Sequence, residues 1–310
     1  MSDWGKGVIN DIGWGQGANN DIGWGSIYDK SNAGETLLGG GGVFNNAFII
    51  EVKTDNAGTS NDNQFQFTGA EGDYDVVAKQ NDIIVQTFSD LSDAATITFA
   101  NGAGTYVLEI TPKATNGFNR IKFNDSDDKD KPKDVKQWGN IVWSSFSKAF
   151  KNCTYMLVTA TDVPNLSNVT SLQEMFRQMR IADPDVSNWD TSNITTLQDM
   201  FHEAEDANPD VRNWDVSNVT NMILTFFRTS FDRDISNWDV SNVTDMNNML
   251  KNSNLSVENL TACYENWSQL SLQQNVSFGA GNTKYNASGQ AGRDILVNTY
   301  NWTITDGGQV

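Results

Sequence analysis

Few side chains in this sequence could perform catalysis or hold a metal ion. The single histidine, His202, lies beside Glu203 and Glu205, but there is no second histidine to complete a zinc triad and no Ser-His-Asp arrangement around it. The only cysteines, Cys153 and Cys263, are too few for a disulfide framework and lie in no C-x-x-C spacing. We therefore expect no enzyme, no catalytic residue, no metal and no cofactor, with His202 on the surface.

Paired carboxylates are the chemistry of glycosidases, and such pairs recur in this chain. Asp183 with Asp185 and Asp232 with Asp234 occupy equivalent positions, but the copy between them has Asn208 at the first place. An amide there fits hydrogen bonding to a backbone turn better than acid–base catalysis. A carbohydrate-active enzyme is thus only a remote alternative.

The acidic stretch 124–130 contains four aspartates and suggests calcium binding. It lacks the spaced ligands, the central glycine and the closing glutamate of an EF-hand loop. We interpret it as a solvated connector between domains, and a metal ion at 125–130 stays an open alternative.

The overall charge argues against two classes of partner. The chain has 21 basic and 39 acidic residues, a net charge of −18, which repels nucleic-acid phosphates and anionic lipids over most of the surface. No stretch approaches the roughly 18 apolar residues of a membrane span, and residues 1–7 lack the basic and apolar regions of a secretory signal. We expect no nucleic-acid binding, no membrane insertion and no export by a signal peptide.

A long repeat dominates the second half of the chain. The phrase Ser-Asn-Val/Ile-Thr recurs at 167–170, 192–195, 217–220 and 241–244, with separations of 25, 25 and 24 residues. A period in this range predicts a solenoid, whose units bury one another's apolar faces. Each copy supplies a tryptophan or other large apolar side chains, so we predict a repeat core of Trp189, Trp214, Trp238, Phe176, Phe201, Phe226 and Met249.

Each unit of this repeat carries a signal for the start of a helix. Thr170 and Thr195 are followed three residues later by Gln173 and Gln198, which is the spacing of a capping box. This spacing predicts a short helix of about two turns in each unit. The phrase before it, at 235–240 in the last copy, predicts a turn and a short strand.

The repeat resembles a known family. The phrase Phe-x-x-Asp-Ile-Ser-Asn-Trp-Asp-Val-Ser-Asn-Val-Thr-Asp-Met at 231–246 is similar to the BspA-type leucine-rich repeat of bacterial surface proteins, and 137–153 and 264–306 resemble its two caps. The resemblance implies a capped, leucine-rich-repeat-like solenoid over 130–310. It also implies adhesion to a bacterial or mucosal surface.

The region before the repeats is rich in short β-type runs. Four consecutive glycines at 39–42 have the backbone freedom of a hinge. Seven runs of β-branched and aromatic residues follow between 48 and 123, separated by Gly, Asn and Asp. They predict a small β-sandwich over 39–129, which resembles an Ig-like or PKD-like domain.

A shorter repeat occupies residues 1–38, where Trp-Gly recurs every ten residues. A segment of this size cannot bury three indoles by itself, so we predict that it docks onto a partner; folding back onto this chain is the alternative. It resembles N-terminal segments of virion proteins of phages that infect Bacteroidota. The predicted docking residues are Trp4, Gly5, Ile12, Trp14, Gly15, Ile22, Trp24, Gly25 and Tyr28.

Together these observations predict a multidomain α+β protein, a small β-sandwich followed by a short leucine-rich-repeat-like solenoid. The predicted function is that of a phage virion surface protein, a spike, fibre or capsid decoration. Its N-terminus would bind capsid or tail proteins, and its repeats would bind a host receptor or glycan. We expect a homo-oligomer, since spikes and fibres are commonly symmetric. The alternative is an adhesin on the bacterial cell surface.

Overall fold

A computed structural model describes residues 46–114, 117–123 and 128–310 of the chain. The Trp-Gly segment, with all nine predicted docking residues, and the glycine hinge lie outside these ranges. Strands and turns dominate the part that is described. Within these ranges, helix occurs only near the C-terminus, in α1 (Val257–Trp267), the 3-10 helix η1 (Ala287–Gly289) and α2 (Gln290–Asn298).

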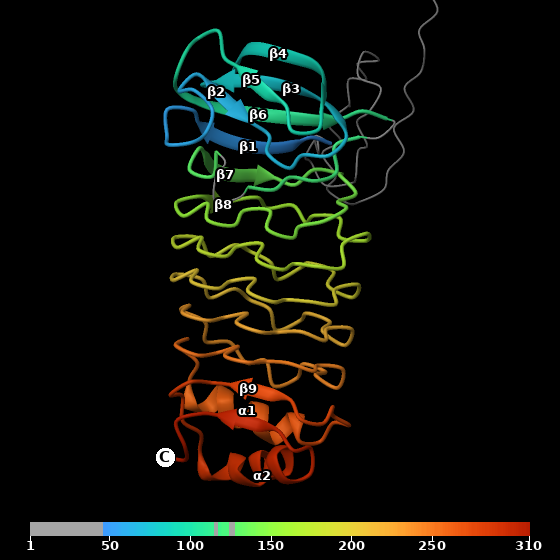
Figure 1. The fold of residues 1–310 in the computed structure, drawn as a ribbon, viewed down its shortest axis with the longest axis vertical. Helices are drawn as coiled ribbons and strands as arrows, with labels where there is room; N and C mark the ends of the chain where they lie inside the picture. Colours follow the sequence, from blue (N-terminus) through green and yellow to red (C-terminus); the bar gives the residue numbers. More distant parts are fainter. Residues whose placement is uncertain (1–45, 115–116, 124–127) are drawn as a thin grey trace, which may run out of the picture. The chain divides into compact units, whose positions relative to one another are not determined.

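The β-rich region is built around one six-stranded sheet (Figure 1). Buried residues alternate with less buried ones along three of its strands, Phe48–Lys53, Asp73–Gln80 and Thr105–Pro112, so that Phe48, Ile50 and Val52 face the core. A separate two-stranded sheet buries Phe65 and Ile97 in the same core. The large sheet has the order β4 (Ile83–Ser92), β3 (Asp73–Gln80), β6 (Thr105–Pro112), β1 (Phe48–Lys53), β7 (Pro132–Gln137) and β8 (Leu157–Val158), and the small one pairs β2 (Gln64–Gln66) with β5 (Thr96–Thr98).

The core of this region continues into the repeat region. Strand β7 follows the predicted boundary at 129, yet it pairs with β1, and β8 pairs with β7. The ring of Phe48 lies 6.2 Å from that of Trp138 and 5.3 Å from that of Trp143, measured between ring centroids. The sheet and the first coil are therefore joined by both hydrogen bonds and apolar packing.

The repeats form coils that stack in chain order between the sheet and the C-terminal helices (Figure 1). Parallel bridges join Ser171 to Thr196, Thr196 to Asn221 and Asn221 to Asp245. Backbone amides of one coil donate to carbonyls of the next; the Phe176 amide, for example, lies 2.9 Å from the Met200 carbonyl oxygen. Other amides form turns within the coil, as the Met175 amide does with the Leu172 carbonyl oxygen at 3.2 Å. The backbone of a repeat is thus satisfied only in part within the unit and depends on its neighbours for the rest.

The predicted helices in the repeats are wrong. Glu174, Asp199 and Leu224 have φ of 54°, 55° and 56°, a left-handed conformation that interrupts an α-helix. The predicted α+β class with a leucine-rich-repeat-like solenoid is therefore wrong as well. The described chain is mostly β with few helices, no described coil has a strand-plus-helix unit, and a large sheet with a two-stranded partner replaces the predicted sandwich.

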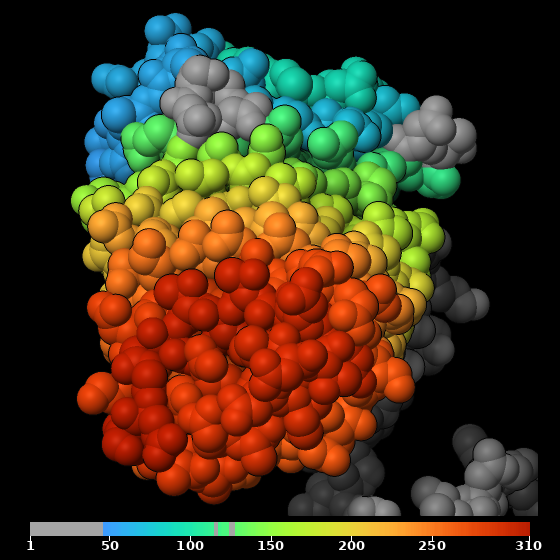
Figure 2. Space-filling view, turned by 60° about the horizontal axis from the view of Figure 1, so that its bottom comes forward, coloured from blue at the N-terminus to red at the C-terminus, as the bar shows by residue number. Residues whose placement is uncertain are grey.

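A helical segment covers the end of the stack, shown in red in Figure 2. The Leu250 amide donates to the Gly279 carbonyl in β9 (Ser277–Gly279), which pairs in parallel with β10 (Thr303–Thr305). A carboxylate oxygen of Asp232 accepts bonds from the amide and the hydroxyl of Ser256, the residue that precedes α1. The preceding coil therefore anchors the start of this helical segment. None of the helices in the described ranges is long and apolar enough to cross a membrane.

Candidate functional site

The predicted repeat-core residues lie inside the stack. Trp214 and Trp238 are 4% and 2% exposed, and their indole N–H groups donate to the carbonyls of Val186 and Val211 in the preceding coil, at 2.9 and 3.0 Å. All seven are buried: Trp189, Trp214, Trp238, Phe176, Phe201, Phe226 and Met249. Side chains so placed support the scaffold, and a ligand would have to meet other residues.

The recurring polar residues also serve the scaffold. The side-chain amides of Asn193, Asn218 and Asn242 donate to serine carbonyls one coil back, at 3.2, 2.8 and 2.7 Å. The hydroxyls of Thr195 and Thr220 bond to the threonine carbonyl of the preceding coil in the same way. The repeated Asn-x-Thr triplets therefore form ladders along the stack.

The carboxylate pairs hold turns and neighbouring coils. Asp183 accepts the amide of Asn208 at 2.9 Å, and Asp185 accepts the amide and hydroxyl of Ser187, bonds that lower the pKa of Asp185. Asp210 pairs with Arg212, which lowers the pKa of this carboxyl to about 2. These aspartates bond to turns and to the neighbouring coil, as their interpretation as turn residues from the sequence suggested.

The remaining reactive side chains are shielded. The Nδ1 atom of His202 contacts the carboxylate of Asp199, its ring packs edge-on against Phe227, and its side chain is only 12% exposed. The expectation of a surface histidine is therefore wrong. Burial raises the pKa of both Cys153 and Cys263, which keeps these thiols protonated.

One face of the stack carries charges that differ from coil to coil. Glu174 lies among Lys148, Lys151 and Arg177, at 3.3, 2.8 and 3.1 Å. Burial opposes its ionisation, but the ammonium groups of Lys151 and Lys148 outweigh this and hold the pKa of Glu174 below its usual value. On a later coil Arg228 pairs with Glu203 at 2.9 Å. Residues of this kind vary while the scaffold repeats.

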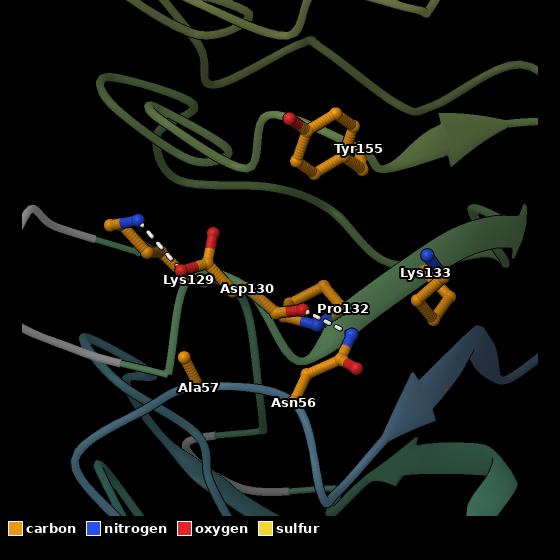
Figure 3. A pocket seen from close by; sticks show the side chains of 7 residues that line it. All are labelled: Asn56, Ala57, Lys129, Asp130, Pro132, Lys133 and Tyr155. Atoms are coloured by element: carbon orange, nitrogen blue, oxygen red, sulfur yellow. Dashed lines mark hydrogen bonds and ion pairs between the residues drawn. The ribbon is translucent and has the colours of Figure 1, made fainter.

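A pocket of about 380 Å³ lies where the β-rich region meets the first coil (Figure 3). Tyr155 forms one side and Asn56 and Ala57 the opposite side, with Lys129 and Lys133 toward the two ends. Tyr155 is 63% exposed. Asp130 and Pro132 complete the lining.

The wall of this pocket is supported by a buried ion pair. The side chains of Asp128 and Lys131 are fully buried, with the ammonium nitrogen 3.8 Å from a carboxylate oxygen. Asp128 accepts the amides of Thr59 and Ser60 at 2.9 Å and that of Gln66 at 2.8 Å. Together with Lys131, it therefore fixes loop 56–66 against the segment before β7.

Lys131 completes this support. Its ammonium donates to the carbonyls of Ser60, Asn61 and Gln64 at 2.9–3.0 Å and to the Ser60 hydroxyl at 2.7 Å. Burial lowers the pKa of Lys131, against the attraction of Asp128. A Cβ at Gly58 would lie 2.4 Å from Asp128 Oδ1, so only glycine fits there.

The acidic stretch is described only from Asp128 onward. Asp128 is occupied by backbone amides, and Asp130 pairs with Lys129 at 2.9 Å. Within the described ranges, no group of three or more His, Cys, Asp or Glu residues is placed to hold a metal ion.

Sequence reasoning did not identify the pocket, because Asn56, Lys133 and Tyr155 are far apart in the chain and share no motif. The one feature of the sequence that could have indicated the pocket is Tyr155, a large aromatic residue outside the recurring Trp and Phe positions.

The folded region is that of a repeat protein: coils 24 or 25 residues apart satisfy one another's backbone. Residues 144–267 match the model of a family described as Mycoplasma protein of unknown function, DUF285. This family is related to the BspA-like surface repeat proteins. Searches of curated proteins and of solved structures gave no match to this chain.

Proposed function

We propose that this chain is a non-catalytic surface-recognition protein whose coil stack holds a binding surface for a host receptor or glycan. The observation that carries the proposal is that the coils contain two kinds of residues: those that hold the stack together and those that differ from coil to coil. Recurring residues such as Trp214, Asn218 and Thr220 bond to the neighbouring coil. Other positions that are at least partly exposed differ between coils, as at the equivalent Gln178, Glu203 and Arg228. A repeated scaffold with a varied exterior suits recognition.

We propose the surface of a phage virion as its location. The support is the Trp-Gly repeat of 1–38, which resembles the N-terminal segments of such virion proteins and carries three tryptophans for binding a capsid or tail partner. In this proposal the protein is a spike, fibre or capsid decoration and a homo-oligomer.

The second candidate is an adhesin on the bacterial cell surface. It is favoured by the match of 144–267 to a family related to BspA-like surface repeat proteins. Both candidates use the coil stack for recognition and differ in what the N-terminal segment contacts.

Deletion of 1–38 separates these candidates. The full chain and the deleted chain are produced during phage assembly, and their incorporation into purified particles is compared. The virion proposal predicts incorporation of the full chain alone; equal incorporation of both, or of neither, would contradict it.

Recognition is tested separately, by retention of the labelled full chain on candidate host cells. The proposal predicts saturable retention that excess unlabelled chain displaces. Absence of retention on every candidate host would leave only a structural role.

A further inference from the structure

We propose that the pocket formed by Asn56, Lys129, Lys133 and Tyr155 binds an acidic sugar, a pyranose bearing a carboxylate. This inference rests on the proposed recognition function and gives it a ligand class. The pocket volume of about 380 Å³ lies within the range of small-molecule sites, roughly 300–1,000 Å³.

The aromatic wall supplies the surface for a sugar ring. Tyr155 is 63% exposed and stands on the side of the pocket opposite Asn56 and Ala57 (Figure 3). An exposed ring of this size has an apolar face and a polar hydroxyl. The apolar C–H face of a pyranose can pack on it while its hydroxyls reach the polar wall.

The polar wall provides hydrogen-bond acceptors that are held in place. The Asn56 side-chain nitrogen donates to the Asp130 carbonyl at 2.8 Å, which fixes the amide, and its side-chain oxygen is an acceptor for sugar hydroxyls. One carboxylate oxygen of Asp130 accepts from Lys129 at 2.9 Å, and the other is available. These two oxygens are suited to O–H donors.

The charge of the pocket selects an anion. Lys129 and Lys133 face a single acidic residue in the lining, Asp130, in a chain whose net charge is −18. Among the described residues, no carboxylate pairs with Lys133. Its ammonium therefore offers a charge-assisted bond to a carboxylate of the ligand, which a neutral sugar would not make.

The pocket is also rigid before any ligand binds. The buried pair of Asp128 and Lys131 ties the loop that carries Asn56 and Ala57 to the segment that carries Lys129 and Lys133. Binding then requires little ordering of the protein, which favours affinity for a small ligand.

The direct test is titration of the full chain with glucuronate and with glucose, followed by protein NMR or calorimetry. We expect glucuronate to bind more tightly than glucose. Lys133→Gln should weaken glucuronate binding about tenfold, the loss expected for a bond to a charged group, and leave glucose unchanged. Tyr155→Ala should abolish binding of both sugars.

Two matched variants control for surface changes away from the pocket. Lys284→Gln removes an exposed lysine in the C-terminal segment, and Ile181→Ala trims an exposed apolar side chain on a coil. Both should bind glucuronate like the parent chain. No glucuronate binding, equal binding of the two sugars, or an unchanged affinity in Lys133→Gln would each overturn the acidic-sugar assignment.

This result is independent of the cell-retention experiment. Retention on cells without glucuronate binding would leave the recognition function in place and remove the pocket as its site. Saturable glucuronate binding without retention on cells would support the pocket and count against adhesion. Retention that an acidic peptide displaces and a polyuronate does not would replace the sugar with a protein partner.

Discussion

The β-rich region and the coil stack satisfy their backbones in different ways. In the β-rich region β3 and β4 pair as a hairpin, with Asn81 and Asp82 at its turn, and buried apolar residues alternate with less buried ones along β1, β3 and β6. In the stack, the amide of Phe176 bonds to Met200, a full coil away. A hairpin such as β3–β4 can form from residues close together in the chain, whereas a coil needs the next coil to complete its backbone hydrogen bonds.

This difference implies different sensitivities to mutation. A coil contributes apolar side chains and hydrogen bonds to both neighbouring coils. A substitution in one coil therefore also lowers the stability of the two coils beside it. The β-rich region combines an apolar core with buried polar anchors between loops, such as Asp128 with Lys131. The variants below test whether the two regions differ in this way.

The largest expected effect is that of Trp214→Ala in the middle of the stack. The indole is 4% exposed and bonds to the Val186 carbonyl of the preceding coil. Its removal leaves a cavity and an unpaired acceptor, and we expect a loss of about 3–5 kcal/mol in the free energy of unfolding. Urea denaturation measures it. Trp214→Phe should cost less, and a loss near zero for the alanine variant would show that the indole is not core.

The next effect is expected in the β-rich region, from Asp128→Ala. This change leaves the buried Lys131 ammonium without its carboxylate and removes the acceptor of three backbone amides. We expect a loss of about 3 kcal/mol, by the same denaturation measurement. Asp62→Ala, at an exposed position of the same loop, should change stability little. Equal stability of the two variants would contradict the anchoring role.

A smaller effect is expected where the stack meets the C-terminal helices. Asp232→Ala removes the carboxylate that binds the amide and hydroxyl of Ser256 and the side-chain amide of Asn259. Loss of hydrogen bonds to a charged group costs about 1.5 kcal/mol. Hydrogen exchange of the Ser256 amide should accelerate as well; unchanged exchange there would mean that Asp232 does not anchor this residue.

The smallest expected effect is a loss of stability at acidic pH. Hydrogen bonds from Ser187, Ser192 and Ser217 lower the pKa of the exposed Asp185, Asp190 and Asp215, and Arg212 lowers that of Asp210 to about 2. Because the folded-state pKa values are depressed, this stabilisation is present above pH 4 and is lost as the pH falls toward 2. The melting temperature should therefore drop over this interval.

The variant Asp210→Asn should show a shallower drop than the parent. The matched control is Asp206→Asn, because the Asp206 carboxylate makes no hydrogen bond among the described residues. An identical acid profile for Asp210→Asn and the parent would rule out this carboxyl as a source of the effect.

The sequence predicted elements whose signals are local. The runs at 48–52, 75–78, 83–85 and 106–110 coincide with β1, β3, β4 and β6, because alternation along a strand shows which side chains face the core. The capping-box spacing at Thr170 wrongly predicted a helix. Amides after Thr170 bond to carbonyls 24 residues further along the chain, and the backbone of Glu174 has a left-handed conformation. That information is not present within one unit.

The pocket could not be predicted for a related reason. Its walls come from residues near 56, 130 and 155, and their approach depends on the pairing of β1 with β7 and of β7 with β8. The acidic composition of 124–130 predicted a solvated connector, whereas the side chain of Asp128 is buried and anchors a loop. Only the fold brings Tyr155 to Lys133.

The central structural claim is that the two regions form one unit, which keeps the pocket between them rigid. Native-state hydrogen exchange in increasing urea tests it most directly. We predict that the most protected amides of β1 and β6 and those of Phe176 and Phe201 open with the same free energy and the same urea dependence. Opening of either region at low urea, while the other stays protected, would contradict the claim.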